Sequence, residues 1–80
     1  MRLHNEARQV MIKGAITIRL GNRIRRRRME LGLSQERLGE EAGLHRTYIG
    51  AVERGEKNLT VLTLSKIARA LKRAPAFFLE

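Results

Sequence analysis

Residues 35–53 read QERLGEEAGLHRTYIGAVE, and this stretch predicts two short helices joined by a tight turn at Gly43. Apolar residues recur at helical spacing on both sides of the turn: Leu38, Ala42, Leu44, Ile49 and Val52. Ending one helix and redirecting the chain within a few residues favours a positive φ, which costs a residue with a side chain about 1 kcal/mol or more. Gly43 avoids that cost. We therefore expect two amphipathic helices that meet at Gly43.

Gly39 supports the same interpretation, because glycine is a poor residue inside a helix and needs a packing reason there. Closely crossing helices need a small residue at their contact, and Gly39 would supply it. Gln35, Gly39, Gly43, Ile49 and Val52 together have the spacing that resembles a DNA-binding helix-turn-helix.

With its flanking residues, the region from about Leu20 to Leu79 resembles the lambda Cro/C1-type repressor family. Within that family, three segments look most like the small controller proteins of restriction-modification systems: His45–Ile49, Glu53–Thr60 and Phe77–Phe78. The resemblance implies an all-α fold, a compact bundle of five short helices that contains the helix-turn-helix. Residues 1–15 are expected to form a flexible or partly helical arm, with a short helix over 5–12 as one option, and residues 16–80 the DNA-binding and dimerisation domain.

The composition favours a polyanionic partner and argues against several other classes. The 80 residues carry 17 Lys and Arg against 8 Glu, a net charge of +9, and residues 1–33 hold +7 of it. There is no Cys or Asp, and the two His alone cannot close a metal site, so we expect no metal, no cofactor and no enzyme. No apolar run is long enough for a membrane span or a secretory signal, so a cytoplasmic, nucleoid-associated protein is expected.

Capping residues place the remaining helices. Helix formation is expected from Thr17 to Leu31 with Gly32 ending it, after Ser34, from about His45 to Glu53, after Thr60 to about Leu71, and in a short segment begun by Pro75. The inward stripe of the helix after Thr60 is expected to hold Val61, Leu64, Ile67, Ala68 and Leu71. Arg27 stands where the family usually has an apolar residue. Either its stem packs with the guanidinium in solvent, or the helix turns so that Met29 packs instead.

The helix from about His45 is the candidate for the DNA major groove, and four of its residues are candidates for base contacts: His45, Arg46, Thr47 and Ala51. Arg46 leads because a guanidinium can bond two acceptors of guanine at once. By resemblance, Arg46 and Thr47 would touch bases and Tyr48 the backbone. Alternatively, Arg46 is an exposed arginine paired with a nearby Glu, and His45 serves as a helix-start residue or a phosphate donor.

Phosphate contacts are expected from residues that flank this helix: Gln35, Tyr48, Arg54, Lys57, Asn58 and Arg28. The role of Gln35 follows from the resemblance, and simple helix initiation is its alternative. Glu53 is expected to pair with Arg28 or Arg54 rather than touch DNA.

Five apolar residues exceed what so small a core needs and are expected to form a twofold dimer interface: Leu59, Leu62, Phe77, Phe78 and Leu79. Burial of one Phe within its own chain is the alternative.

These observations together predict a sequence-specific regulator that binds double-stranded DNA as a homodimer on an inverted repeat, with RNA polymerase as a candidate further partner. Among the possible functions, a restriction-modification controller is the favoured prediction. An antitoxin-type repressor is its close rival, and a nonspecific basic DNA-coating or protein-interaction module is the rival from a different class.

Overall fold

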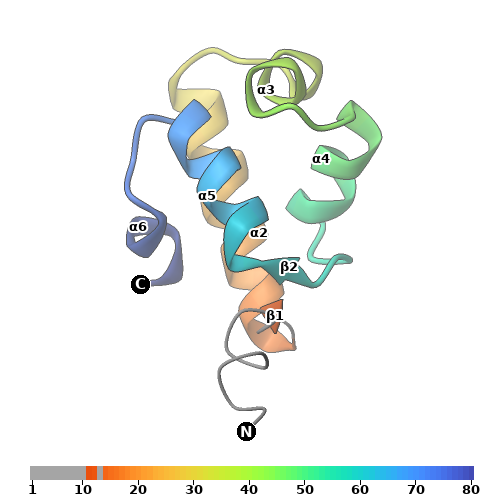
Figure 1. Ribbon diagram of the computed structural model, residues 1–80, viewed down its shortest axis with the longest axis vertical. Coiled ribbons are helices and arrows are strands. Elements are labelled where there is room, and N and C mark those ends of the chain that lie inside the picture. Colours follow the sequence, from red (N-terminus) through yellow and green to blue (C-terminus); the bar gives the residue numbers. More distant parts are fainter. Residues whose placement is uncertain (1–10, 13) are drawn as a thin grey trace, which may run out of the picture.

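The computed structural model describes residues 11–12 and 14–80, and its helices surround one small apolar core (Figure 1). The elements in chain order are β1 (Met11–Ile12), α2 (Ala15–Glu30), α3 (Gln35–Ala42), α4 (Arg46–Glu53), β2 (Leu59–Thr60), α5 (Val61–Ala70) and α6 (Pro75–Leu79). The described part of the chain thus contains the five predicted helices. In Figure 1, α5 lies in front of α2, while α3 and α4 lie together on the side away from α6.

The core is built from residues of all five helices together with Leu59 of β2. Its largest fully buried side chains are Leu20, Ile24, Leu38, Ile49, Leu59, Leu64, Ile67, Leu71 and Phe78. The predicted inward stripe of α5 is confirmed from Leu64 onward, but Val61 is 54% exposed, so its assignment to the stripe is wrong. As the first residue of α5, directly after the cap Thr60, it lies outside the packed turns.

The start of α2 differs from the prediction. The helix begins at Ala15 after Gly14, whose φ is 83°, and Thr17 lies inside it, so Thr17 is not the N-cap. Thr17 is buried, and its hydroxyl donates to the carbonyl oxygen of Gly14 at 2.6 Å. The carbonyl oxygen of Gly55 lies 3.1 Å from the same hydroxyl oxygen, within hydrogen-bond distance. Thr17 therefore ties the first turn of α2 to the loop after α4. The predicted end is confirmed, because Gly32 follows α2 with a φ of 72°.

Arg27 agrees in part with the first predicted arrangement, in which its stem packs and its guanidinium lies in solvent. Its side chain is only 13% exposed, and its Nε donates to the carbonyl oxygen of Leu71 at 3.0 Å, so the guanidinium is bonded within the protein. Met29 is 59% exposed, so the alternative in which Met29 packs into the core is wrong. A partly buried donor needs a partner, and the free carbonyl after α5 provides it.

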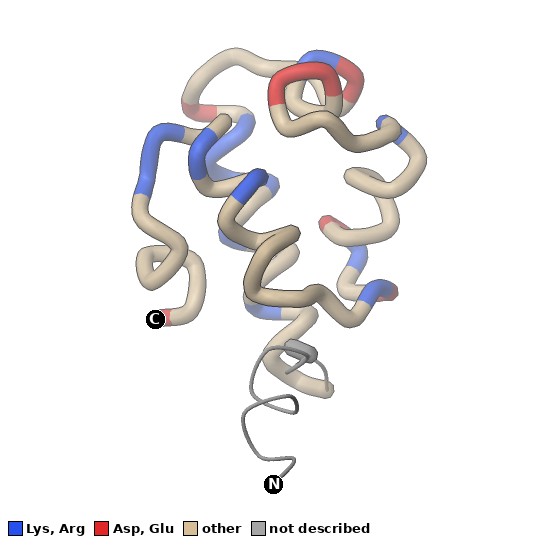
Figure 2. The backbone as a smooth tube through the Cα atoms, in the orientation of Figure 1, with Lys and Arg blue, Asp and Glu red and all other residues tan. Residues whose placement is uncertain are grey.

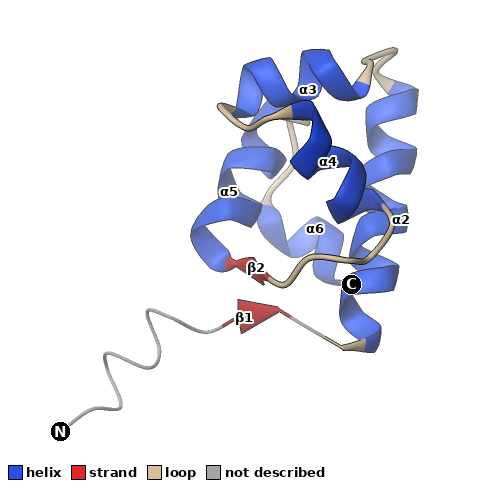
Figure 3. Cartoon of the chain, turned by 90° about the vertical axis from the view of Figure 1, so that its right-hand side faces the viewer, coloured by secondary structure: helices blue, strands red, loops and turns tan. Residues whose placement is uncertain are grey.

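A small antiparallel sheet joins the start of the described chain to the segment before α5 (Figure 3). Met11 pairs with Thr60 and Ile12 with Leu59. The optional helix over 5–12 is thus wrong at residues 11 and 12, while residues 5–10 lie outside the described part. Along this extended backbone the side chain of Leu59 points into the core, where it is 1% exposed. The Thr60 side chain accepts a hydrogen bond from the backbone N–H of Thr63 and so caps α5.

Phe78 is also buried, at 1% exposed, because α6 folds back against α2 and α5. Its ring meets that of Phe77 edge to face, with centroids 5.1 Å apart. Leu59 and Phe78 therefore belong to the core, and their prediction as dimer-interface residues is wrong. The alternative of one self-buried Phe is the one that the structure shows.

Within residues 11–12 and 14–80, none of the helices combines the length and the hydropathy of a transmembrane span.

Candidate nucleic-acid interface

The turn between α3 and α4 has the geometry that the sequence predicts. Gly43 ends α3 with φ 73° and ψ 33°, a left-handed conformation. A Cβ at Gly39 would overlap the carbonyl oxygen of Leu44, so only glycine lets the incoming chain lie this close to α3. These two glycines fix how α4 is presented relative to α3.

Side chains cap both helices of this unit. Ser34 Oγ accepts from the backbone N–H of Arg37 at 2.9 Å, as its predicted cap role requires. His45 Nδ1 accepts from the backbone N–H of Thr47 at 3.0 Å, so His45 is the N-cap of α4. With Nδ1 as acceptor, the neutral imidazole carries its proton on Nε2, which leaves a hydrogen-bond donor at the exposed start of α4.

The first turn of α4 points outward. Arg46 and Thr47 are exposed, and no carboxylate in residues 14–80 forms an ion pair with Arg46. The alternative in which Arg46 pairs with a nearby Glu is therefore wrong. Tyr48 is half-buried against the core, and this desolvation raises the pKa of its phenol, so the hydroxyl stays protonated at neutral pH.

Ala51 is buried, at 6% exposed, so its prediction as a base contact is wrong. All residues from Ile49 to Glu53 are buried, which means that the second half of α4 is packed on more than one face. Within α4, only the first turn is accessible to a ligand.

A buried cluster of polar side chains joins α2, α3 and α4. The Glu53 carboxylate accepts from Arg28 Nε at 2.6 Å, from Arg28 Nη2 at 3.0 Å and from Gln35 Nε2 at 3.1 Å. Arg28 Nη1 also donates to the carbonyl oxygen of Leu33 at 2.8 Å. The predicted pair of Glu53 with Arg28 is confirmed, and it is 3% and 12% exposed at its two side chains.

These hydrogen bonds to Glu53 bear on two residues that were predicted to contact phosphates, Arg28 and Gln35. Arg28 directs all of its nitrogens to protein acceptors, so its prediction as a backbone contact is wrong. Gln35 donates one amide N–H to Glu53, yet it opens α3 and remains half-buried, so its backbone N–H at the helix start and its second amide N–H are left for a phosphate. Sequence reasoning identified Glu53 and Arg28 but missed the part that Gln35 plays in holding them.

The loop after α4 presents further cations. Arg54, Lys57 and Asn58 are exposed, and Gly55 turns the chain with a φ of 77°. Arg54 Nε donates to the Glu56 carboxylate at 2.9 Å, and this hydrogen bond lowers the pKa of Glu56, so the pair is fully ionised at neutral pH. Arg54 would have to exchange Glu56 for a phosphate, whereas Lys57 forms no ion pair with any described carboxylate.

Three of the five residues predicted at the dimer interface remain at the surface. Leu62 is 67% exposed and Leu79 is 48% exposed, while Phe77 is half-buried with the Arg73 guanidinium 5.1 Å from its ring centre. Lys and Arg recur along α2 and α5, and a group of acidic positions lies on α3 (Figure 2).

The fold and this arrangement of a capped, outward-pointing α4 on α3 define a helix-turn-helix DNA-binding regulator. A family described as helix-turn-helix matches residues 24–78, and the chain belongs to this family, the lambda Cro/C1 type. Proteins of this family are regulators rather than enzymes.

Relatives in sequence include control proteins. The chain is 54% identical over 52 residues to the control protein C.SmaI of Serratia marcescens, a match that covers 65% of this chain and 62% of that protein. It is 38% identical over 66 residues to the control protein C.BamHI of Bacillus amyloliquefaciens, covering 81% and 82%. The chain thus spans just under two thirds of the length of the Serratia relative.

A solved structure supports the same grouping. The restriction-modification controller protein C.AhdI from Aeromonas hydrophila superposes with a TM-score of 0.78 at 40% identity, covering 81% of this chain and 98% of that one. The predicted all-α bundle with its helix-turn-helix is therefore confirmed.

Proposed function

We propose that this protein is a controller of a restriction-modification system that binds an inverted-repeat operator as a homodimer. The exposed first turn of α4 supports this proposal most directly, because Arg46 and Thr47 lie outward on a helix that is fixed by the Gly39–Gly43 turn and by the Glu53 cluster. The names of the control proteins among its relatives add the restriction-modification context.

In this proposal α4 enters the major groove by its first turn. Arg46 bonds two acceptors of a guanine, while Thr47 offers a hydroxyl and a methyl group to a neighbouring base. The His45 Nε2–H can donate to a base edge or a phosphate. Lys57, Asn58, Arg54 and the start of α3 hold phosphates on either side and fix the register of α4.

The dimer is proposed to form through those predicted interface residues that remain at the surface: Leu62 and Leu79, which are exposed, and Phe77, which is half-buried. A twofold pair would place two copies of α4 about 34 Å apart, one turn of the duplex, so that each reads one half of an inverted repeat. Occupancy beside a promoter would then exclude RNA polymerase, or recruit it.

Selection of duplexes from a random-sequence pool tests the proposal, with sedimentation equilibrium run in parallel. The expected result is an enriched inverted repeat with half-sites about one helical turn apart, bound by two chains. Absence of any enriched sequence, or a protein that stays monomeric at micromolar concentration on and off DNA, would overturn it. Stable copurification with a small toxin from the native host would favour the antitoxin alternative.

A further inference from the structure

The run of arginines in α2 divides into two pairs with different environments. Arg27 and Arg28 bond to acceptors within the protein, and their side chains are only 13% and 12% exposed. Arg25 and Arg26 are exposed, and neither forms an ion pair with a carboxylate of the described chain. The guanidinium groups of the second pair are therefore available to an external anion.

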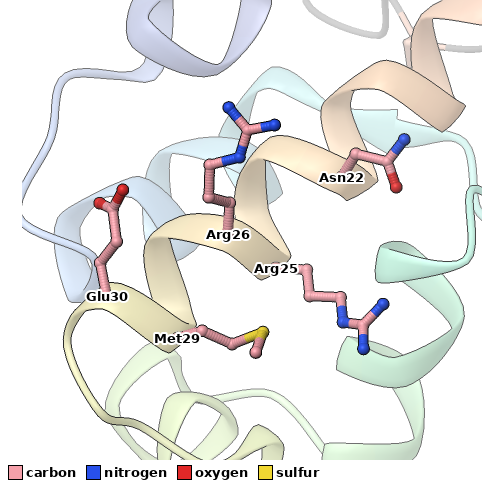
Figure 4. Close-up of a pocket in the computed structure, with 5 residues that line it drawn as sticks. All are labelled: Asn22, Arg25, Arg26, Met29 and Glu30. Carbon is pink, nitrogen blue, oxygen red and sulfur yellow. The ribbon is translucent and has the colours of Figure 1, made fainter.

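Arg25 and Arg26 border a shallow recess of about 620 Å³ on the outer side of α2, with Asn22, Met29 and Glu30. Figure 4 shows the two guanidinium groups leaving the helix in different directions, with the Asn22 amide nearer the start of the helix. Glu30 is the acidic member of the lining, and its Oε1 lies 3.3 Å from Arg27 Nη1. The recess thus offers two cations and an amide donor, while its one carboxylate is already paired.

These groups suit phosphate oxygens rather than bases. A guanidinium without a carboxylate partner binds phosphate with short, charge-assisted hydrogen bonds, and an amide adds a further donor. None of the five lining residues is aromatic, so the recess has no platform on which a base could stack.

Arg25 lies on the side of α2 that faces the end of α4. A Cβ at Gly21 would overlap the carbonyl oxygens of Val52 and Glu53, and Arg28 bonds the Glu53 carboxylate. Arg25 comes four residues after Gly21 and three before Arg28, so it shares their face of the helix. The same end of α4 continues into the loop of Arg54 and Lys57, so Arg25 lies on the side of α2 toward this cationic loop.

We propose that the outer face of α2, through Arg25, Arg26 and Asn22, binds phosphates of the operator duplex next to those held by the α3–α4 unit. This inference rests on the proposed DNA binding by α4 and adds a second row of backbone contacts to it. These contacts carry no base information, so they raise affinity for every sequence alike.

The test is a double-mutant cycle between protein charges and DNA phosphates. Duplexes that carry the sequence enriched by the wild-type protein are made with successive blocks of three phosphates replaced by neutral methylphosphonates. Binding of the wild-type protein and of R25Q/R26Q is measured for each block between 50 and 200 mM salt. K66Q/R69Q on α5 removes the same charge from another helix and serves as the matched control, since both of its residues are exposed.

The proposal expects one block whose neutralisation weakens the wild-type protein and the control but not R25Q/R26Q. The salt slope of R25Q/R26Q on unmodified DNA should also be smaller by about 1.8 per protomer, which corresponds to about a tenfold smaller loss of affinity between 50 and 200 mM salt. Circular dichroism confirms that each variant is folded.

Two results would overturn the proposal: an equal response of R25Q/R26Q and the wild-type protein to every block, or equal losses of binding in R25Q/R26Q and K66Q/R69Q. Failure to enrich any sequence would count against the proposed function instead, so the two failures are distinguishable.

Discussion

Replacing Glu53 with Ala should remove a large share of the stability of this domain. Glu53 accepts three hydrogen bonds from Arg28 and Gln35, and its side chain is only 3% exposed. Without it, the guanidinium of Arg28, 12% exposed, is left without its counter-charge, which costs about 3–5 kcal/mol for a buried pair. An 80-residue domain has about 4–12 kcal/mol in total.

Urea unfolding followed by circular dichroism measures this loss, and the midpoint should fall while the slope with urea stays constant. In thermal unfolding the expected decrease in Tm is about 12 °C or more. Glu56→Gln, which breaks the exposed pair with Arg54, is the matched control and should leave the midpoint nearly unchanged.

The single variants R28M and E53M and the double variant R28M/E53M form a double-mutant cycle around the same pair. The double variant removes both charges together, so it should be more stable than the sum of the single losses implies, by about 1–3 kcal/mol. A loss below about 1 kcal/mol for Glu53→Ala, or strictly additive losses in the cycle, would show that the pair is not energetically buried, because either result is what an exposed and independent pair gives.

Further expectations concern the turn, a helix end and the dimer. Gly39→Ala should lower the free energy of unfolding by about 1–3 kcal/mol, because the added Cβ would overlap a backbone oxygen. Gly43→Ala should cost less, about 1 kcal/mol, because the space around Gly43 is open and only its positive φ is strained. Equal losses of the two variants in urea unfolding would contradict this. Lys72→Gly should stabilise by about 0.5–1 kcal/mol, since Lys72 has a φ of 61° at the end of α5; a lower thermal midpoint would count against the idea. Leu62→Lys should weaken self-association by about tenfold or more in sedimentation equilibrium, and an unchanged dissociation constant would remove Leu62 from the proposed interface.

The helix-turn-helix was predictable because its determinants are local. Gly39, Gly43, Ser34 and Thr60 act on residues within one or two helical turns, so their spacing alone places the helices. Residues 49 and 52 were placed inward by the same periodicity, and they are buried.

What sequence reasoning missed depends on contacts between distant segments. Leu59 is turned inward by pairing with β1, and Phe78 is buried because α6 returns to α2, and neither effect follows from helical spacing. Ala51 was assigned outward by periodicity, although the second half of α4 is buried on more than one face. Lys72 occupies a left-handed position that glycine usually marks, so the sequence carried no signal for it.

Arg46 on the first turn of α4 is proposed to read bases. The most direct measurement compares binding of the enriched duplex and a scrambled duplex by the wild-type protein, Arg46→Ala and Lys57→Ala. Arg46→Ala should reduce the difference in binding free energy between the two duplexes by about 1–3 kcal/mol, whereas Lys57→Ala should weaken both alike and lower the salt slope by about 0.9 per protomer. If Arg46→Ala weakens binding to both duplexes equally and leaves the difference between them intact, Arg46 does not read bases.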